Sequence, residues 1–158
     1  NGNPIVGAKI DVWHSSPEGF YEQQVPKQTD MNLLGKFTTD AEGHFWFRSV
    51  KPAGYPIPID GPVGDLVRAG KRHNFRPAHL HFLIFKEGFK TLISQIYSND
   101  DDRLETDVQF GVTRALIGNY IRHDGPAPAP EVTGAWYSLD QTFVMEPGKS
   151  RLPKPPIR

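Results

Sequence analysis

The chain of 158 residues is long enough for one domain with a sizeable hydrophobic core. Its 18 basic and 18 acidic residues cancel, so no strong field attracts nucleic acid or an anionic membrane. Because the chain has no cysteine, disulfides and thiolate metal sites are excluded, and any metal must be bound through nitrogen and oxygen. No segment reads as a membrane span and no signal peptide is visible, which favours a cytoplasmic protein.

The pattern of the chain predicts short strands joined by turns. A first strand over residues 5–13 places Val6, Ala8, Ile10 and Val12 on one face. Six or more such strands, with 15 glycines and 15 prolines scattered between them, predict an all-β fold, an antiparallel β-sandwich with long loops in one domain over residues 1–158. The later expected elements are hairpin strands over 36–39 and 44–50, a proline-rich loop over 52–62, one helical turn over 65–71, a strand from 79, a strand over 90–98, an ambiguous segment over 112–122 and a last strand over 136–145.

The first candidate for chemistry is a pair of histidines at the start of an apolar strand. His79 and His81 are separated by one residue, so on a strand they project to the same side, about 6–7 Å apart along the backbone. Both imidazoles can then bind one metal ion. Pro77 favours an extended Arg76, which holds that guanidinium near the same place. A buried pair of hydrogen-bonded histidines explains the spacing equally well, so the motif alone leaves both interpretations open.

Further ligands for such a metal must come from other parts of the chain. No carboxylate stands beside the two histidines, and tyrosine is the other oxygen donor. Tyr21 and Tyr55 follow glycine and proline turns, which favours them over the tyrosines at 97, 120 and 137, expected in the core or an interface. Two further histidines, His14 and His73, could reach such a site, whereas His44 and His123 are expected at the surface. The acidic loop 99–102 is expected to be solvated, because its spacing is not that of a calcium-binding EF-hand.

An ordered series of motifs resembles the intradiol ring-cleavage dioxygenases. The resemblance extends from residue 3 to at least residue 111, and it implies one non-haem Fe(III) as the cofactor. The motifs are Asp-Val-Trp-His at 11–14, Gly-Phe-Tyr at 19–21, Thr-Asp-x-x-Gly at 39–43, Pro-x-Gly-Tyr at 52–55, Gly-Pro at 61–62 and Arg-Pro-Ala-His-Leu-His-Phe at 76–82. The residues that the resemblance implies are Tyr21, Tyr55, His79 and His81 as iron ligands, Arg76 and Gln95 as supporting catalytic residues, and Phe110 and Gly111 as lining of the substrate pocket.

The resemblance also implies a reaction. An aromatic ortho-diol gives up both phenolic protons, one of them to Tyr55 as this tyrosine leaves the iron, and O₂ opens the ring to a diacid. Arg76 would stabilise the anionic charge on the substrate, and Gln95 would orient Arg76 or a metal-bound oxygen. Residues 57–64, around Asp60, resemble the hydroxyquinol branch more than the catechol branch. Hydroxyquinol is therefore the first expected substrate, catechol the second, and a chlorocatechol a third.

Three features depart from the family pattern or allow another interpretation. Hydroxyquinol and catechol dioxygenases carry an upstream helical segment that dimerises. These 158 residues lack it, so they resemble the catalytic domain of a protein expected to be a homodimer at full length. Leu34 stands where the family usually has arginine. Residues 2–8 and 39–45 also resemble transthyretin-type (prealbumin) modules, which are β-sandwiches without enzymatic activity; the two tyrosines, two histidines and Arg76 discriminate against them.

Overall fold

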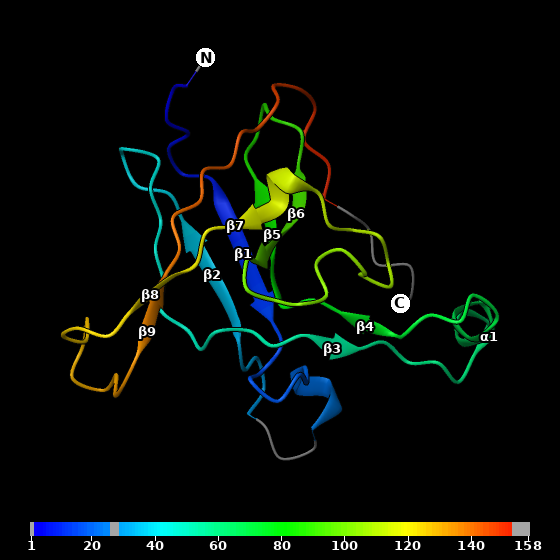
Figure 1. Ribbon diagram of the computed structural model, residues 1–158. Helices are drawn as coiled ribbons and strands as arrows, with labels where there is room; N and C mark the ends of the chain where they lie inside the picture. Colours follow the sequence, from blue (N-terminus) through cyan, green and yellow to red (C-terminus); the bar gives the residue numbers. More distant parts are fainter. Residues whose placement is uncertain (1, 26–28, 153–158) are drawn as a thin grey trace.

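The computed structural model describes residues 2–25 and 29–152, which are mostly β with one α-helix (Figure 1). None of the described helices is long and apolar enough to cross a membrane. The elements in chain order are β1 (Lys9–His14), a 3₁₀-helix (Glu22–Gln24), β2 (Leu34–Thr38), β3 (Tyr55–Pro56), α1 (Pro62–Ala69), β4 (Phe75–Arg76), β5 (His79–Phe85), β6 (Leu92–Ser98), a second 3₁₀-helix (Arg114–Leu116), β7 (Ile117–Gly118), β8 (Ile121–His123) and β9 (Trp136–Ser138).

The central sheet has five strands in the order β2-β1-β5-β6-β7. Its first four strands pair antiparallel, and β7 pairs parallel to β6. The strand β5 lies in the middle, and its register sets His81 opposite Trp13 on β1 and Gln95 on β6. Two short ladders, β3–β4 and β8–β9, complete the pairing, and the first of them sets Tyr55 opposite Arg76. Strand register thus sets His81 beside Gln95 and Tyr55 beside Arg76.

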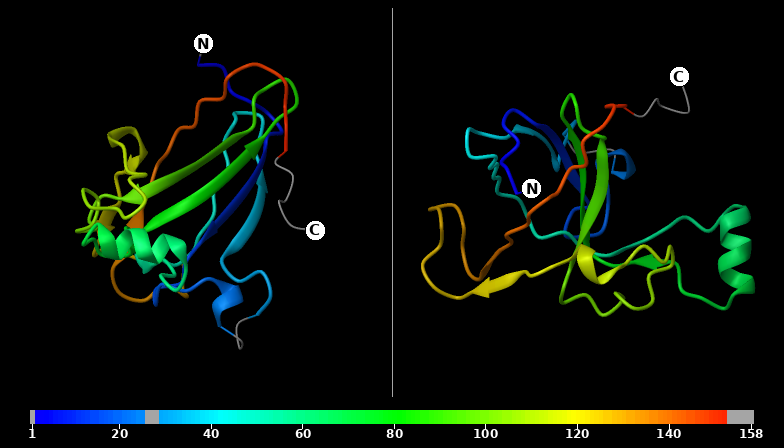
Figure 2. Two further views of the ribbon diagram at one scale, coloured as in Figure 1. Left: turned by 90° about the vertical axis from the view of Figure 1, so that its right-hand side faces the viewer. Right: turned by 90° about the horizontal axis from the view of Figure 1, so that it is seen from above.

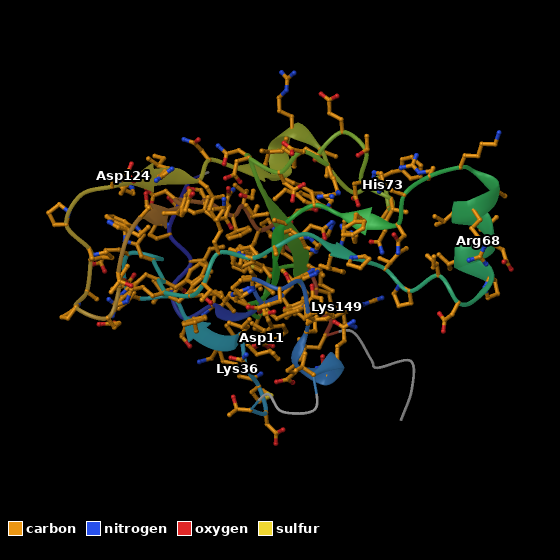
Figure 3. All side chains as sticks on the ribbon, turned by 60° about the horizontal axis from the view of Figure 1, so that its bottom comes forward. Asp11, Lys36, Arg68, His73, Asp124 and Lys149 are labelled. Atoms are coloured by element: carbon orange, nitrogen blue, oxygen red, sulfur yellow. The ribbon has the colours of Figure 1, made fainter. Side chains whose placement is uncertain are left out.

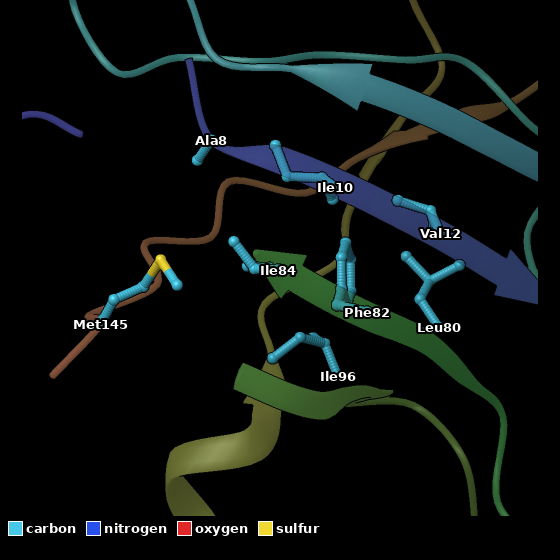
Figure 4. Packing of buried hydrophobic residues seen from close by; sticks show 8 residues of the cluster. All are labelled: Ala8, Ile10, Val12, Leu80, Phe82, Ile84, Ile96 and Met145. Atoms are coloured by element: carbon cyan, nitrogen blue, oxygen red, sulfur yellow. The ribbon is translucent and has the colours of Figure 1, made fainter. Parts of the chain in front are cut away.

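One face of this sheet carries the hydrophobic core (Figure 4). Side chains alternate along β1 and β5, so every second residue is buried, and the residues predicted for the core face of the first strand are confirmed from position 8 onward. Val6 is half exposed and is excluded from the core. The buried cluster consists of Ala8, Ile10, Val12, Leu80, Phe82, Ile84, Ile96 and Met145.

The strands expected to cover this core differ from the prediction. Over 44–50 the burial alternates as predicted, because Phe45 and Phe47 pack on the core while Trp46 is 78% exposed. The segment makes no ladder in the described part of the chain, so it is extended backbone rather than a strand. The last strand is shorter than predicted: only Trp136–Ser138 pair, and the segment beyond contributes Phe143 to the core without regular pairing. Alternating apolar residues indicate which face is buried but not whether a neighbour supplies hydrogen bonds.

An arm of the chain leaves the sheet between β3 and β4 and carries α1 at its far end (Figures 1 and 2). The helix begins at Pro62, three residues before the predicted turn, because proline is compatible with a first helical position. Gly64 packs directly on the chain before it, where a Cβ would lie 1.9 Å from the carbonyl oxygen of Ile59. The predicted loop 52–62 therefore contains β3 and the entry to the arm, and the ambiguous segment 112–122 is a 3₁₀-helix followed by β7 and the start of β8.

Candidate metal centre

The face of the sheet opposite the core carries the two histidines of β5. Their Nε2 atoms are 3.0 Å apart, as expected for side chains that project to the same side of a strand. The ring of Trp13 stacks on His81, with centroids 4.9 Å apart and planes 4° from parallel. This contact follows from the register of β1 and β5, which sets the two residues opposite each other. Trp13 therefore supports one wall of the site.

Two glycine turns bring the tyrosines to the histidines. Gly19 has φ +83°, and a Cβ on it would lie 3.0 Å from the carbonyl oxygen of Gly54, so the two turns approach closely at their glycines. Each turn then presents its tyrosine: Tyr21 follows the first, and Tyr55 opens β3 next to Gly54. The two hydroxyl oxygens are 3.2 Å apart, and Tyr55 Oη is 3.5 Å from Nε2 of His79. The predicted ligand set is thus one cluster of side chains.

The spacing within this cluster fits one metal ion. Successive donor atoms are 3.2, 3.5 and 3.0 Å apart from Tyr21 Oη through to His81 Nε2. Two ligands that each lie about 2.0–2.2 Å from a shared ion, at angles near 90–109°, are about 2.8–3.6 Å from each other. Over residues 2–25 and 29–152, no three His, Cys, Asp or Glu side chains gather as a metal site. The donor set therefore consists of imidazole and phenol, which suits a hard cation such as Fe(III).

The protonation of the cluster also suits a cation. Nδ1 of His79 donates to the carbonyl of Pro77 at 2.6 Å, which leaves its Nε2 lone pair toward the other donors. Burial lowers the pKa of His79 to about 4, and burial together with the neighbouring His79 and Arg76 lowers that of His81 to about 3. Burial and the hydrogen bond to Tyr55 raise the pKa of Tyr21, so this phenol ionises only when a bound cation offsets the cost.

We expect the metal-free protein to lose stability as the pH falls from 7 to 5. Both histidines have folded-state pKa values below the ordinary 6.5, so below pH 6.5 the unfolded chain takes up protons that the folded chain does not. The free energy of unfolding should fall by about 1–2 kcal/mol per histidine at pH 5. Urea unfolding of the metal-free protein at several pH values measures this. A His81→Asn variant should show a shallower slope; an unchanged slope would contradict the assignment.

Arg76 is buried beside the cluster and uses every edge of its guanidinium. Nη1 lies 3.0 Å from Nε2 of His79, and both Nη atoms donate to Oε1 of Gln95 at 3.3 Å. Nη2 donates to Tyr97 Oη at 2.6 Å, and Nε faces Oδ1 of Asp107 at 3.4 Å. Burial opposes the charge of Arg76, but Tyr97 and Asp107 hold its pKa above the ordinary value. The structure thus brings the predicted Arg76 and Gln95 together and adds two residues that sequence reasoning missed.

The two residues predicted to line the substrate pocket have different surroundings. Phe110 is 75% exposed, has φ +55°, and packs its ring against the guanidinium of Arg72 at 4.0 Å. Gly111 lies against the arginine network: a Cβ on it would be 2.7 Å from Tyr97 Oη and 3.2 Å from Nη2 of Arg76. Gly111 is therefore adjacent to the site, and Phe110 lies at the exposed rim of the same segment.

The other candidate residues lie elsewhere. His14 is buried and bonded to the Ser15 carbonyl and to Ser49 Oγ, so it is part of the packing. The acidic loop was expected to be solvated only, but Asp101 accepts a hydrogen bond from the backbone N–H of Ala78 at 2.8 Å and so fixes the start of β5. Of the remaining histidines, His44 is exposed as predicted. His73 lies on the arm and bonds Thr106 Oγ1 (Figure 3), and His123 stacks on Trp136.

Comparison with known proteins assigns the chain to a family. The family model described as Dioxygenase matches residues 1–140. The chain belongs to the intradiol ring-cleavage dioxygenase family. It is 46% identical over 149 residues to a hydroxyquinol 1,2-dioxygenase of Rhizobium sp. (strain MTP-10005), covering 92% of this chain and 50% of that protein. It is 39% identical over 124 residues to a catechol 1,2-dioxygenase of Candida albicans, covering 78% of this chain and 41% of the relative.

Solved structures agree with this assignment. A hydroxyquinol 1,2-dioxygenase from Pseudomonas putida DLL-E4 superposes with a TM-score of 0.82 at 38% identity, over 93% of this chain and 52% of that one. A catechol 1,2-dioxygenase from Acinetobacter sp. ADP1 gives a TM-score of 0.84 at 29% identity, over 92% and 48%. The chain thus spans about half the length of the curated relatives it matches.

Proposed function

We propose that the protein cleaves the ring of an aromatic ortho-diol with O₂, between the two hydroxyl-bearing carbons, at one Fe(III). The observation that carries the proposal is the cluster of four donor atoms, each 3.0–3.5 Å from the next, with the buried Arg76 beside it. The metal ligands are Tyr21, Tyr55, His79 and His81. We further propose that residues 1–158 form one catalytic domain, a β-sandwich of the prealbumin type, and that the full-length cytoplasmic protein is a homodimer.

Bound iron would supply a Lewis acid that lowers the pKa of the diol and makes its ring carbon reactive toward O₂. The residues of the chain do the rest. Tyr55 would hold the iron as a phenolate and would also accept one phenolic proton of the diol, since a base must reach the proton it takes. The guanidinium of Arg76 stabilises anionic charge on the substrate, and Gln95 holds two of its N–H groups through Oε1. Gly111 and Phe110 line the approach to the diol.

A non-enzymatic binding module of the transthyretin type is the alternative function. The buried arginine weighs against it, because a charge desolvated to this degree costs free energy and serves no purpose in a β-sandwich used only for adhesion. Two buried imidazoles with lowered pKa values next to two phenols are also more typical of a functional site than of ordinary packing in a β-sandwich.

The purified protein should be red to burgundy, because tyrosinate bound to Fe(III) gives a charge-transfer band in the visible range. Iron analysis should give one atom per chain, and the His81→Asn variant should lose both the colour and most of the iron. A colourless protein that cleaves diols with stoichiometric zinc would contradict the proposed metal.

Hydroxyquinol should be cleaved with a higher kcat/KM than catechol. The reason is the resemblance of residues 57–64 to the hydroxyquinol branch, together with the 46% identity to a hydroxyquinol 1,2-dioxygenase. These residues lead from β3 into the arm, and Asp60 on them is exposed. Initial rates of diacid formation with each diol at saturating O₂ measure the preference. Equal or reversed kcat/KM values would mean that specificity does not follow this loop.

A further inference from the structure

Asp107 is a buried carboxylate between the arginine and the substrate-lining segment. The residue as a whole is 2% exposed. Its side chain is 1% exposed, and the side chain of Arg76 is 4% exposed. A buried carboxylate is costly unless its charge is balanced and its oxygens are hydrogen-bonded. Here Oδ1 faces Nε of Arg76 at 3.4 Å and accepts from the N–H of Gln109 at 3.3 Å, while Oδ2 accepts from the N–H of Gly111 at 2.8 Å.

The segment that Asp107 begins is fixed to Arg76 in other ways as well. The N–H of Val108 donates to the carbonyl of Phe75, so the segment is bound to β4 beside Arg76. At the other end, Gly111 lies so close to the guanidinium that a Cβ would be 3.2 Å from Nη2 of Arg76. Arg76 and Gly111 therefore lie so close that a movement of either one toward the other meets the neighbour at once.

We propose that Asp107 is a positioning residue that holds Arg76 and the Phe110–Gly111 segment in one fixed arrangement, so that the charged group and the wall of the diol pocket act as a unit. The inference rests on the proposed function and deepens it. The polar contacts of the Asp107 side chain go to Arg76 and to backbone N–H groups, whereas the residues that carry the four donor atoms stand on β5, on β3 and after the turn at Gly19. Loss of Asp107 should therefore impair diol binding and turnover but spare the resting iron site.

The test uses the iron-loaded chain and a nitro-substituted catechol, titrated without O₂ so that binding is measured apart from turnover. Asp107→Asn should keep its iron and its resting visible band. Its Kd for the nitrocatechol should rise, and its kcat with hydroxyquinol should fall, each by about 10- to 100-fold, which is typical for loss of an outer partner of a site. Asp100→Asn is the matched control, because this exposed carboxylate pairs with Lys51 and should change Kd less than about twofold.

A double-mutant cycle with Arg76→Gln distinguishes positioning from a general structural effect. If Asp107 acts through Arg76, Asp107→Asn should raise Kd by less than about threefold once Arg76 is Gln. Equal losses in both backgrounds, or an unchanged Kd in Asp107→Asn alone, would overturn the inference. If Asp107→Asn does not fold, Gly111→Ala tests the same link from its other end and should raise Kd with the resting band intact; an unchanged Kd there would overturn it. A wild-type protein that holds iron but does not respond to the diol would instead overturn the proposed function.

Discussion

Tyr55→Phe is expected to retain most of the iron but to lose nearly all turnover, whereas Tyr21→Phe is expected to lose much of its iron. Tyr21 Oη bonds only Tyr55 Oη among the donors, and its turn is fixed at Gly19, so in the proposed site we expect it to remain a ligand throughout. Tyr55 stands between Tyr21 and His79, where we expect an incoming diol to replace it and use it as a base. The loss of a general base costs about 10²–10⁴-fold in kcat.

Iron content, the visible band and kcat of both variants measure this difference. The band should shift in Tyr55→Phe and weaken in Tyr21→Phe. A diol complex in which Tyr21 has moved away while Tyr55 remains bound would reverse the assignment. A Cβ on Gly54 would lie 2.7 Å from the Arg76 carbonyl, and Tyr55 is paired in β3, so the backbone at Tyr55 is fixed. We therefore expect a diol to displace Tyr55 by rotation of its side chain.

Gly54→Val should destabilise the fold and dismantle the metal site together. Its Cβ would meet the Arg76 carbonyl at 2.7 Å and Asp101 Oδ2 at 3.1 Å, and neither the backbone nor the carboxylate that fixes β5 can withdraw cheaply. Overpacking of this kind costs about 1–3 kcal/mol of stability. Because Tyr55 pairs with Arg76 through the same ladder, the variant should also lose most of its iron and activity.

The control is Gly125→Ala, since no atom lies within 4 Å of a Cβ at that position. It should match the wild type in urea midpoint, iron content and kcat. Full iron and activity in Gly54→Val would mean that the two turns adjust to each other and that the close glycine contact does not position the tyrosines.

The sequence was most informative where a local rule decides geometry. The alternation of a strand was enough to place His79 and His81 on one side of β5 and the apolar residue between them in the core. Glycine and proline correctly indicated the turn before Tyr21, but Tyr55 lies in β3 and not in the predicted loop. That the four side chains converge could be anticipated only from the resemblance, because convergence depends on the packing of segments distant in the chain.

Residues that act through tertiary contacts had no such signal. Asp107 looks like any acidic residue in a loop, and its burial depends on an arginine 31 positions away. Tyr97 was expected in the core or an interface, and it is buried, but its hydroxyl bonds Arg76. Trp13 could have been found only if the pairing of β1 with β5 were known. The strand predicted over 44–50 failed for the same reason, because the residues of this segment do not reveal whether a neighbouring strand forms hydrogen bonds with it.

The position of β5 restricts how the length of this chain can change in evolution. Its alternate residues serve two environments that have nothing in common, the hydrocarbon core and the polar cluster around His79 and His81. Inserting or deleting one residue within β5 would exchange the two sets, so that imidazoles entered the core and Phe82 faced the metal ligands. The arm over residues 57–74 carries no such alternation. Natural variants of this chain should therefore differ in length along the arm, while β5 keeps its seven residues.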